Sequence, residues 1–456
     1  MQNINIIKQT RDRLNNVGPG MCAMKWLHQT LYLHTGDNHS CYHPRPHRIP
    51  LHEIKDDPSA LHNTSHKKEQ RKQMLEGERP SECYYCWNIE DLEGDHISDR
   101  MLHSSSNYAI NEIENLAKLP WDAPINPRYL EVSFGNGCNY RCGYCCPQAS
   151  TLWMDEIKKH GNYDLTYNQY GIEFLDEGGS YYGPKDENPY IDAFWKWWPS
   201  LRKDLHTLRI TGGEPLMNPG AMQFFDLLEK EPAPQLEISI NSNLGVTKAK
   251  MNKMFDRVQS LLDQGKIKSF SLYTSIEGWG AQAEYMRTGM KCEHWEENLR
   301  EALTRGFQVG IMCTFNVLCV ATYQNFLERV IHWRKQLGDS KFRKLQFDIP
   351  YLKEPPHWML NILPRDFLML HMDENLKFIE DNKEWFTDVE YEKMKRVRDY
   401  ADQNPVDKNK IQQGRRDFYS FFAENDKRLV GLNLLEVFPM YEDFYNQCKE
   451  VYEEWK

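Results

Sequence analysis

Residues 128–148, RYLEVSFGNGCNYRCGYCCPQ, join a short β-like run to a loop that carries three spaced cysteines. The run YLEVSF, which starts at Tyr129, predicts a strand. Cys138, Cys142 and Cys145 then form a C-x3-C-x2-C pattern. Three thiolates can bind three irons of a [4Fe–4S] cluster and leave the fourth iron open to a small molecule. Zinc bound by these cysteines and a remote histidine is the alternative, although zinc sites usually show C-x2-C pairs.

Five further β-like runs follow this strand, and amphipathic helical stretches separate most of them. The runs begin at Thr207, Gln235, Ser269, Phe307 and Lys344. Helical periodicity is clearest in residues 221–230, 253–264, 294–306 and 323–337. Strands that alternate with helices predict a parallel sheet, and six such units predict an α/β fold built as a partial (β/α)6 TIM-like barrel. The chemistry of such barrels lies at the carboxyl ends of the strands.

Length and composition narrow the class of protein further. The chain has 456 residues, enough for two or three domains, and its net charge of −10 provides no overall positive field for a nucleic acid. We expect the one dense basic run in the N-terminal half, KKEQRK from Lys67, to be a solvated helix face. The sequence shows neither a run of about 20 apolar residues nor the apolar core of a signal peptide, so we expect no membrane partner and a cytoplasmic location. Twelve cysteines in a reducing compartment favour metal or redox chemistry over disulfides.

Shifts in composition and a proline-rich stretch divide the chain into four predicted parts. Residues 1–118 are rich in Cys and His, and residues 119–128 read as a Pro-rich linker. Residues 129–360 form the predicted barrel, with a long aromatic insertion at 147–206. Residues 361–456 form a charged, helical C-terminal extension. The first part shows little apolar periodicity, so we expect it to need a metal or a neighbouring domain for stability.

The N-terminal part holds four more cysteines, which are spaced C-x18-C-x41-C-x2-C: Cys22, Cys41, Cys83 and Cys86. Four thiolates can bind zinc tetrahedrally or complete an Fe–S cluster. We favour the cluster and keep zinc, or the absence of any metal, as alternatives. Several histidines lie among these cysteines, and we expect most of them to be exposed: His28, His34, His39, His43 and His47.

With Tyr144 just before its third cysteine, the C-x3-C-x2-C loop resembles that of the radical S-adenosylmethionine (SAM) superfamily. TGGEP at residues 211–215 is similar to the glycine-rich turn of that family, in which an acidic residue binds the SAM ammonium group. INSNLG and TSIEG, at the ends of the third and fourth runs, and the later EYMRTG are also similar to segments of relatives. By this resemblance the SAM-binding residues are Tyr144, Gly212, Gly213, Glu214, Pro215, Ser242, Asn243, Ser275, Glu277 and Arg287.

The resemblance implies an enzyme that cleaves SAM reductively at a [4Fe–4S] cluster and abstracts hydrogen from its substrate with a 5′-deoxyadenosyl radical. A reductant such as flavodoxin or ferredoxin would supply the electron. The N-terminal cysteines resemble the auxiliary-cluster modules called twitch and SPASM, which favours a peptide or protein substrate. A small molecule or nucleoside is the alternative substrate, and a zinc-stabilised binding protein is the alternative outside catalysis. Asp348, at the end of the sixth run, is our candidate proton acceptor, with Tyr273, Cys313 and Cys319 behind it.

Overall fold

The computed structural model describes residues 4–167, 170, 181–183, 186–338, 344–403, 405–429 and 431–455. The chain forms two compact units. The first comprises residues 1–136, 178–241 and 252–271, and the second comprises residues 137–177, 242–251 and 272–456. Part of the predicted insertion, namely residues 168, 169, 171–180, 184 and 185, lies outside the described residues.

The first unit is built on strands whose hydrogen-bonded order is β3-β2-β1-β4-β6-β7. Its strands are β1 (His28–Tyr32), β2 (Asp37–His39), β3 (His47–Arg48), β4 (Tyr129–Ser133), β6 (Thr207–Thr211) and β7 (Ala233–Asn241). The pairs β1–β4, β4–β6 and β6–β7 are parallel, whereas β2 pairs antiparallel with both β1 and β3. An α/β fold with a mostly parallel sheet is therefore confirmed.

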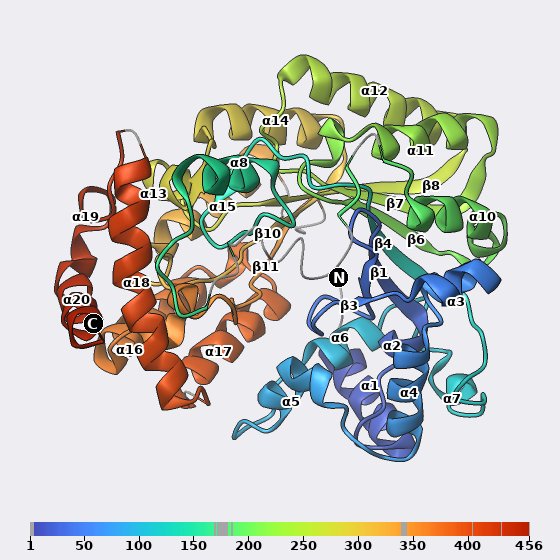
Figure 1. The fold of residues 1–456 in the computed structure, drawn as a ribbon, viewed down its shortest axis with the longest axis horizontal. Helices are drawn as coiled ribbons and strands as arrows, with labels where there is room; N and C mark the ends of the chain where they lie inside the picture. Colours follow the sequence, from blue (N-terminus) through green and yellow to red (C-terminus); the bar gives the residue numbers. More distant parts are fainter. Residues whose placement is uncertain are drawn as a thin grey trace. The chain divides into compact units, whose positions relative to one another are not determined.

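The helices of the first unit come mostly from its first 118 residues (Figure 1). They are α1 (Ile4–Val17), α2 (Met24–Leu27), α3 (Leu51–Asp56), α4 (Ser65–Leu75), α5 (Tyr84–Glu90), α6 (Asp99–Ser104), α7 (Ile113–Leu116), α10 (Pro189–Asp204) and α11 (Pro219–Lys230). Side chains from α1, α2, α4 and α7 share one buried apolar cluster, with Trp26 and Met74 among its members. The N-terminal segment thus has a core of its own, which its weak periodicity did not predict.

Helix-capping residues explain where several of these helices begin. Asn188 accepts hydrogen bonds from the backbone N–H groups at the start of α10, and Pro189 occupies the first helical position. Asn218 and Pro219 play the same parts at the start of α11. Trp198 of α10 is buried against Phe224 of α11, with ring centroids 4.9 Å apart. The aromatic residues of this part of the insertion therefore serve packing.

The second unit contains two further strands of the predicted set, β10 (Gln308–Met312) and β11 (Leu345–Asp348), which pair in parallel. Two elements, β8 (Ile267–Ser275) and α12 (Lys248–Asp263), have residues in both units. All six predicted strands and the four predicted helices of the barrel are present in the structure, so the periodicities identified them correctly. α15 ends where Gly338 adopts a left-handed conformation, with φ at 59°.

The helices of the second unit include the predicted C-terminal extension. They are α8 (Thr151–His160), α13 (Ala281–Met286), α14 (Cys292–Thr304), α15 (Tyr323–Leu337), α16 (Arg365–Asp381), α17 (Asp388–Gln403), α18 (Lys408–Arg428), α19 (Leu434–Val437) and α20 (Glu442–Glu454). α18 and α20 pack side by side, as the red helices of Figure 1 show. A small separate sheet pairs β5 (Arg141–Cys142) with β9 (Arg287–Thr288) in antiparallel fashion. No pattern in the sequence predicted this small sheet.

Candidate active site and cysteine cavity

The three-cysteine loop lies in the second unit, where hydrogen bonds hold its middle. β5 pairs with β9 so that Cys142 is directly opposite Arg287. The backbone N–H of Gly143 donates to Met286 O at 2.8 Å, and that of Cys145 donates to Cys142 O at 2.9 Å. All three cysteines are free thiols and partly exposed. Backbone hydrogen bonds therefore hold the loop in a defined conformation, and its three thiols are partly exposed.

The C-terminal extension packs against this loop. Arg141 Nη1 donates to Asn425 Oδ1 of α18 at 3.0 Å. Trp358, which precedes the extension, contacts the loop as well. A Cβ added at Gly143 would lie only 2.3 Å from its ring, so glycine lets the ring approach the loop backbone. The Trp358 ring also meets Tyr144 edge-on, with centroids 5.4 Å apart. The extension, whose role could not be read from its sequence, thus helps to hold the cysteine loop.

Two of the three thiols receive nitrogen donors. Asn243 Nδ2 lies 3.7 Å from Cys138 Sγ and also donates to Asn139 Oδ1 at 2.8 Å. Arg287 Nη1 lies 3.5 Å from Cys142 Sγ. Burial raises the pKa of Cys142 to about 12, while the nearby Arg287 acts in the opposite direction. Both donors are thus placed to stabilise a bound thiolate, in addition to the SAM contacts that their positions in the sequence suggest.

The other predicted SAM residues of the second unit lie close to this loop or at strand ends. Tyr144 donates its hydroxyl hydrogen to Glu277 Oε1 at 2.8 Å, and Glu277 also binds Arg287. Ser242 donates its backbone N–H to Tyr273 O at 2.9 Å. Ser275 is the last residue of β8. The structure therefore brings Tyr144, Glu277 and Arg287 into one contact group.

The GGEP turn lies in the first unit, directly after β6. Gly212 has a φ of 140°, and a Cβ there would lie 2.7 Å from Gly135 O, so only glycine fits without strain. Gly213 donates its backbone N–H to the same oxygen at 3.2 Å. Glu214 is fully buried, and its Oε1 accepts the backbone N–H of Leu216 at 3.1 Å, at the start of the short helix that Pro215 begins. The turn is thus rigid and carries one carboxylate.

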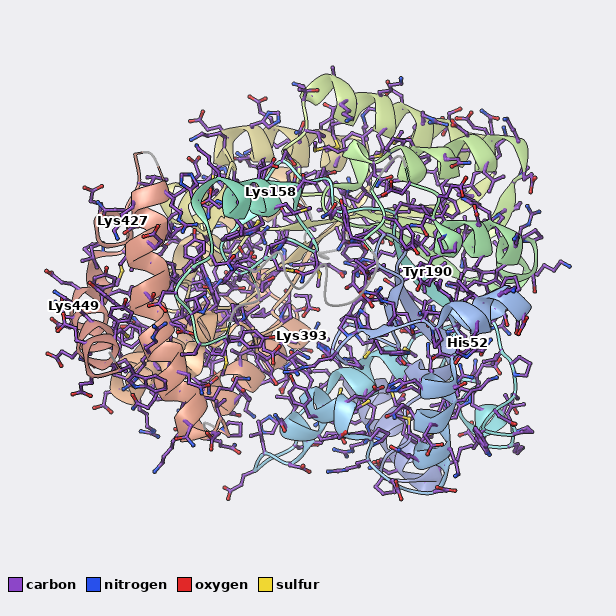
Figure 2. The ribbon with its side chains drawn as sticks, viewed as in Figure 1. His52, Lys158, Tyr190, Lys393, Lys427 and Lys449 are labelled. Atoms are coloured by element: carbon purple, nitrogen blue, oxygen red, sulfur yellow. The ribbon has the colours of Figure 1, made fainter. Side chains whose placement is uncertain are left out.

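Asp348 ends β11, as predicted, but its carboxylate is already paired. Lys393 of α17, labelled in Figure 2, forms an ion pair with Asp348 Oδ1. The same oxygen accepts the backbone N–H of Ile349 at 2.8 Å. An ion-paired carboxylate is a weaker base than a free one. The role of Asp348 as a proton acceptor stays a prediction.

The four N-terminal cysteines line one cavity in the first unit. His43, Trp87, Asp99, Arg100 and His103 also line this cavity. Cys22 and Cys41 flank the β1–β2 hairpin, whereas Cys83 ends a short 3-10 helix (Ser81–Cys83) and Cys86 lies in α5. Four thiols separated by up to 64 residues in the sequence therefore meet at one place.

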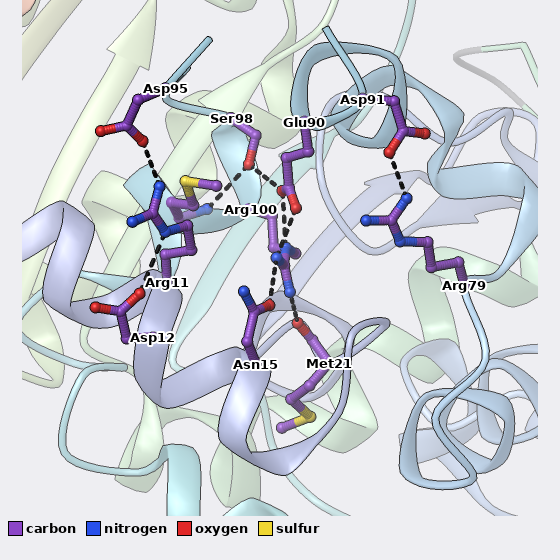
Figure 3. A network of polar contacts seen from close by, with 11 residues as sticks. Arg11, Asp12, Asn15, Met21, Arg79, Glu90, Asp91, Asp95, Ser98 and Arg100 are labelled. Atoms are coloured by element: carbon purple, nitrogen blue, oxygen red, sulfur yellow. Dashed lines mark hydrogen bonds and ion pairs between the residues drawn. The ribbon is translucent and has the colours of Figure 1, made fainter. Parts of the chain in front are cut away.

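Buried ion pairs hold the segments around this cavity. Arg100 donates to both Glu90 oxygens, at 2.9 and 2.6 Å, and to Met21 O at 2.8 Å, just before Cys22 (Figure 3). Lys25 is buried and paired with Glu82. Burial opposes its charge, but the neighbouring Cys83 and Glu82 raise its pKa overall. Nothing in the spacing of the cysteines pointed to these arginine and lysine side chains.

Two sequence predictions for this region were wrong. Four of the five histidines expected to be exposed are buried: His28, His34, His39 and His43. Their segments are enclosed by the sheet and the surrounding helices; His43, for example, stacks on Tyr85 with centroids 3.6 Å apart. Lys67 and Arg71, in the basic run expected to be solvated, are also buried in α4. Burial lowers the pKa of Lys67 well below its usual value, and its amine donates to His28 O at 3.0 Å.

Comparison with known proteins identifies one part of the chain. Residues 132–328 match the family model described as Radical SAM superfamily. Residues 132–328 of the chain therefore form a radical SAM domain. No curated protein matches the chain. Within the described ranges, no helix is both long and apolar enough to cross a lipid bilayer.

A radical SAM domain implies an enzyme that uses a [4Fe–4S] cluster, SAM and an electron donor for radical chemistry. It sets aside the alternative of a purely structural zinc protein.

Proposed function

We propose that Cys138, Cys142 and Cys145 bind the [4Fe–4S] cluster of this domain. Three observations support the assignment: the thiols share one loop, none forms a disulfide, and Asn243 and Arg287 place N–H donors beside two of them. Hydrogen bonds to the sulfurs are a recognised means of tuning such clusters. Among the described residues, no group of three Cys, His, Asp or Glu side chains is arranged around a single metal ion.

The SAM-binding residues follow from the resemblance and from the local geometry of each turn. Gly212, Gly213 and the buried Glu214 form a narrow turn with one carboxylate, which suits a ligand ammonium group. When bound, the cluster and SAM together supply a 5′-deoxyadenosyl radical that abstracts hydrogen from an unactivated C–H bond. The protein residues orient SAM and exclude water from the radical.

The four-cysteine cavity supports a second, auxiliary Fe–S cluster. The observation that carries this step is that Cys22, Cys41, Cys83 and Cys86 line one cavity. Four thiols that meet at one place can bind a complete Fe–S cluster. Four protein thiolates would leave no open iron, so this cluster would carry electrons rather than bind substrate. Zinc remains the alternative.

We propose a peptide or protein side chain as the substrate. The support is the β1–β2 hairpin between Cys22 and Cys41, which resembles the hairpin of twitch and SPASM modules and adds to the edge of the parallel sheet through β1 and β4. Relatives with such modules mostly modify peptides or proteins. A small molecule or nucleoside is the competing substrate class.

Iron analysis tests both cluster assignments. After anaerobic reconstitution, the wild type should bind about eight irons and the Cys138→Ala, Cys142→Ala, Cys145→Ala variant about four. With SAM and a strong reductant, only the wild type should release 5′-deoxyadenosine. About four irons in the wild type, with zinc bound as well, would leave the loop cluster but overturn the auxiliary one. Equal iron content and 5′-deoxyadenosine release in both proteins would overturn the loop assignment.

Deuterium transfer tests the substrate class. The enzyme is incubated with SAM, reductant and size fractions of a deuterated cell extract, and deuterium in 5′-deoxyadenosine is measured by mass spectrometry. Enrichment with the polypeptide fraction alone supports the proposal. Enrichment with the small-molecule fraction alone supports the alternative.

A further inference from the structure

The side chain of Arg287 is divided between a buried carboxylate and a cysteine of the cluster-binding loop. Its Nε donates to Glu277 Oε2 at 2.8 Å, and its Nη2 donates to Glu277 Oε1. Its third nitrogen, Nη1, is 3.5 Å from Cys142 Sγ. All three of these residues lie within the second unit. One edge of the guanidinium therefore donates to Glu277, and one remaining N–H group is directed at the sulfur.

The fold leaves this arginine little freedom. Cys142 and Arg287 are directly opposite each other in the β5–β9 pair, so their side chains project from the same face of that small sheet. Glu277 is fully buried, and its Oε1 also accepts the Tyr144 hydroxyl at 2.8 Å and the backbone N–H of Thr314 at 3.2 Å. A planar guanidinium bound at two points by a fixed carboxylate is itself fixed in direction.

We infer that the Glu277–Arg287 pair is a positioning device that makes the loop cluster easier to reduce. The pair as a whole is neutral, but its positive end faces Cys142 and its negative end faces away from it. A hydrogen bond and a positive charge beside a ligand sulfur stabilise the more negative, reduced cluster and so raise the reduction potential. This differs from a direct contact between Arg287 and the SAM carboxylate, which the resemblance alone implied. The inference rests on the proposed loop cluster.

Substitutions at the two ends of the pair should shift the potential in opposite directions. Arg287→Met removes the positive end and the hydrogen bond, and leaves the Glu277 carboxylate nearby, so the midpoint potential should fall. Glu277→Gln removes the negative end and leaves the arginine charge, so the potential should rise. Arg287→Lys keeps the charge but cannot bridge Glu277 and Cys142 with one planar group, so the fall should be smaller. A purely structural role predicts no such reversal of sign.

The experiment is an EPR-monitored redox titration of the reconstituted full chain without SAM, following the signal that is lost in the Cys138→Ala, Cys142→Ala, Cys145→Ala variant. At the potential that reduces half of the wild-type cluster, we expect the reduced-to-oxidised ratio in Arg287→Met to be about tenfold lower, a shift of about 59 mV for one electron. Arg305→Met is the matched control, because Arg305 pairs with Glu301 on α14. The midpoint potential of the cluster in this variant should equal that of the wild type.

The affinity for SAM separates this inference from the simpler alternative. An unchanged potential in Arg287→Met with weaker SAM binding would overturn the inference and favour the carboxylate contact. If Arg287→Met assembles no cluster, Glu277→Gln and Arg287→Lys decide: shifts of opposite sign support the inference, and unchanged potentials refute it. Failure of the wild type itself to bind iron would refute the proposed function instead, so the two failures are distinguishable.

Discussion

The buried arginine beside the four-cysteine cavity provides the sharpest test of how the N-terminal segment is held together. The Arg100 side chain is 1% exposed and that of Glu90 is 7% exposed. Arg100→Met leaves a buried carboxylate without its cation and leaves Met21 O and Asn15 Oδ1 without the donors shown in Figure 3. Breaking a buried ion pair by removing one partner costs about 3–5 kcal/mol, so the folded-to-unfolded ratio should fall by a factor of roughly 100 to 4,000.

Amide hydrogen exchange measured by mass spectrometry is the suitable assay, because it reports the opening free energy of individual segments. Peptides from α5 and α6 in Arg100→Met should lose about 3–5 kcal/mol of protection. Peptides from α18, in the other unit, should not change.

Figure 3 also contains the matched control. Arg11 pairs with Asp95, but these side chains are 30% and 51% exposed. Arg11→Met should therefore cost about 0–1 kcal/mol. Adding Glu90→Gln to Arg100→Met should recover part of the loss, because the unpaired charge is removed. A loss in Arg100→Met no larger than that in Arg11→Met would refute the reasoning.

Two further changes test the packing around the cysteine loop. Burial lowers the pKa of His357 to about 3, below its unfolded value, so stability is complete above about pH 6.5 and decreases towards pH 3. In urea unfolding, this histidine should contribute a loss of about 1.4 kcal/mol per pH unit in that range. His357→Gln should make the pH slope shallower by about that amount, whereas His52→Gln, at an exposed position labelled in Figure 2, should leave the slope unchanged. Gly143→Ala places a Cβ against Trp358 and should cost about 1–3 kcal/mol by thermal unfolding, whereas Gly137→Ala, which has open space, should cost little.

One experimental outcome would contradict each of these two predictions. The same pH slope in His357→Gln as in the wild type would mean that this histidine is not kept neutral by burial. Equal thermal stability of the two alanine variants would mean that the Trp358 ring does not approach the loop backbone closely.

Much of the fold could be predicted from local patterns. The six strands and the helices between them follow from periods of two and 3.6 residues, which are properties of the chain near each residue. Apart from α4, whose basic run was expected to be helical, the N-terminal helices were missed. Their apolar residues, such as Met24 and Trp26 of the short α2, are too few for a periodic signal. They gain their stability from a shared cluster with residues distant in sequence, such as Met74 and Ile113.

The candidate site also has some features that local sequence patterns predict and others that they do not. The spacing C-x3-C-x2-C and the GGEP turn are local, because a loop of eight residues and a turn of four are enough to define them. The burial of His28 and Lys67 could not be predicted, since residue type alone favours exposure for both.

The sequence by itself therefore determined the strand and helix pattern, the spacing of the three loop cysteines and the glycines of the GGEP turn. Only the tertiary structure decided that four N-terminal cysteines share a cavity, that Asp348 is paired with Lys393, and that Arg287 faces Cys142 rather than standing free. The physical reason is that short-range patterns depend on backbone geometry within a few residues. Ion pairs and cavities instead depend on which distant segments pack together, and up to 284 residues separate such partners as Arg141 and Asn425.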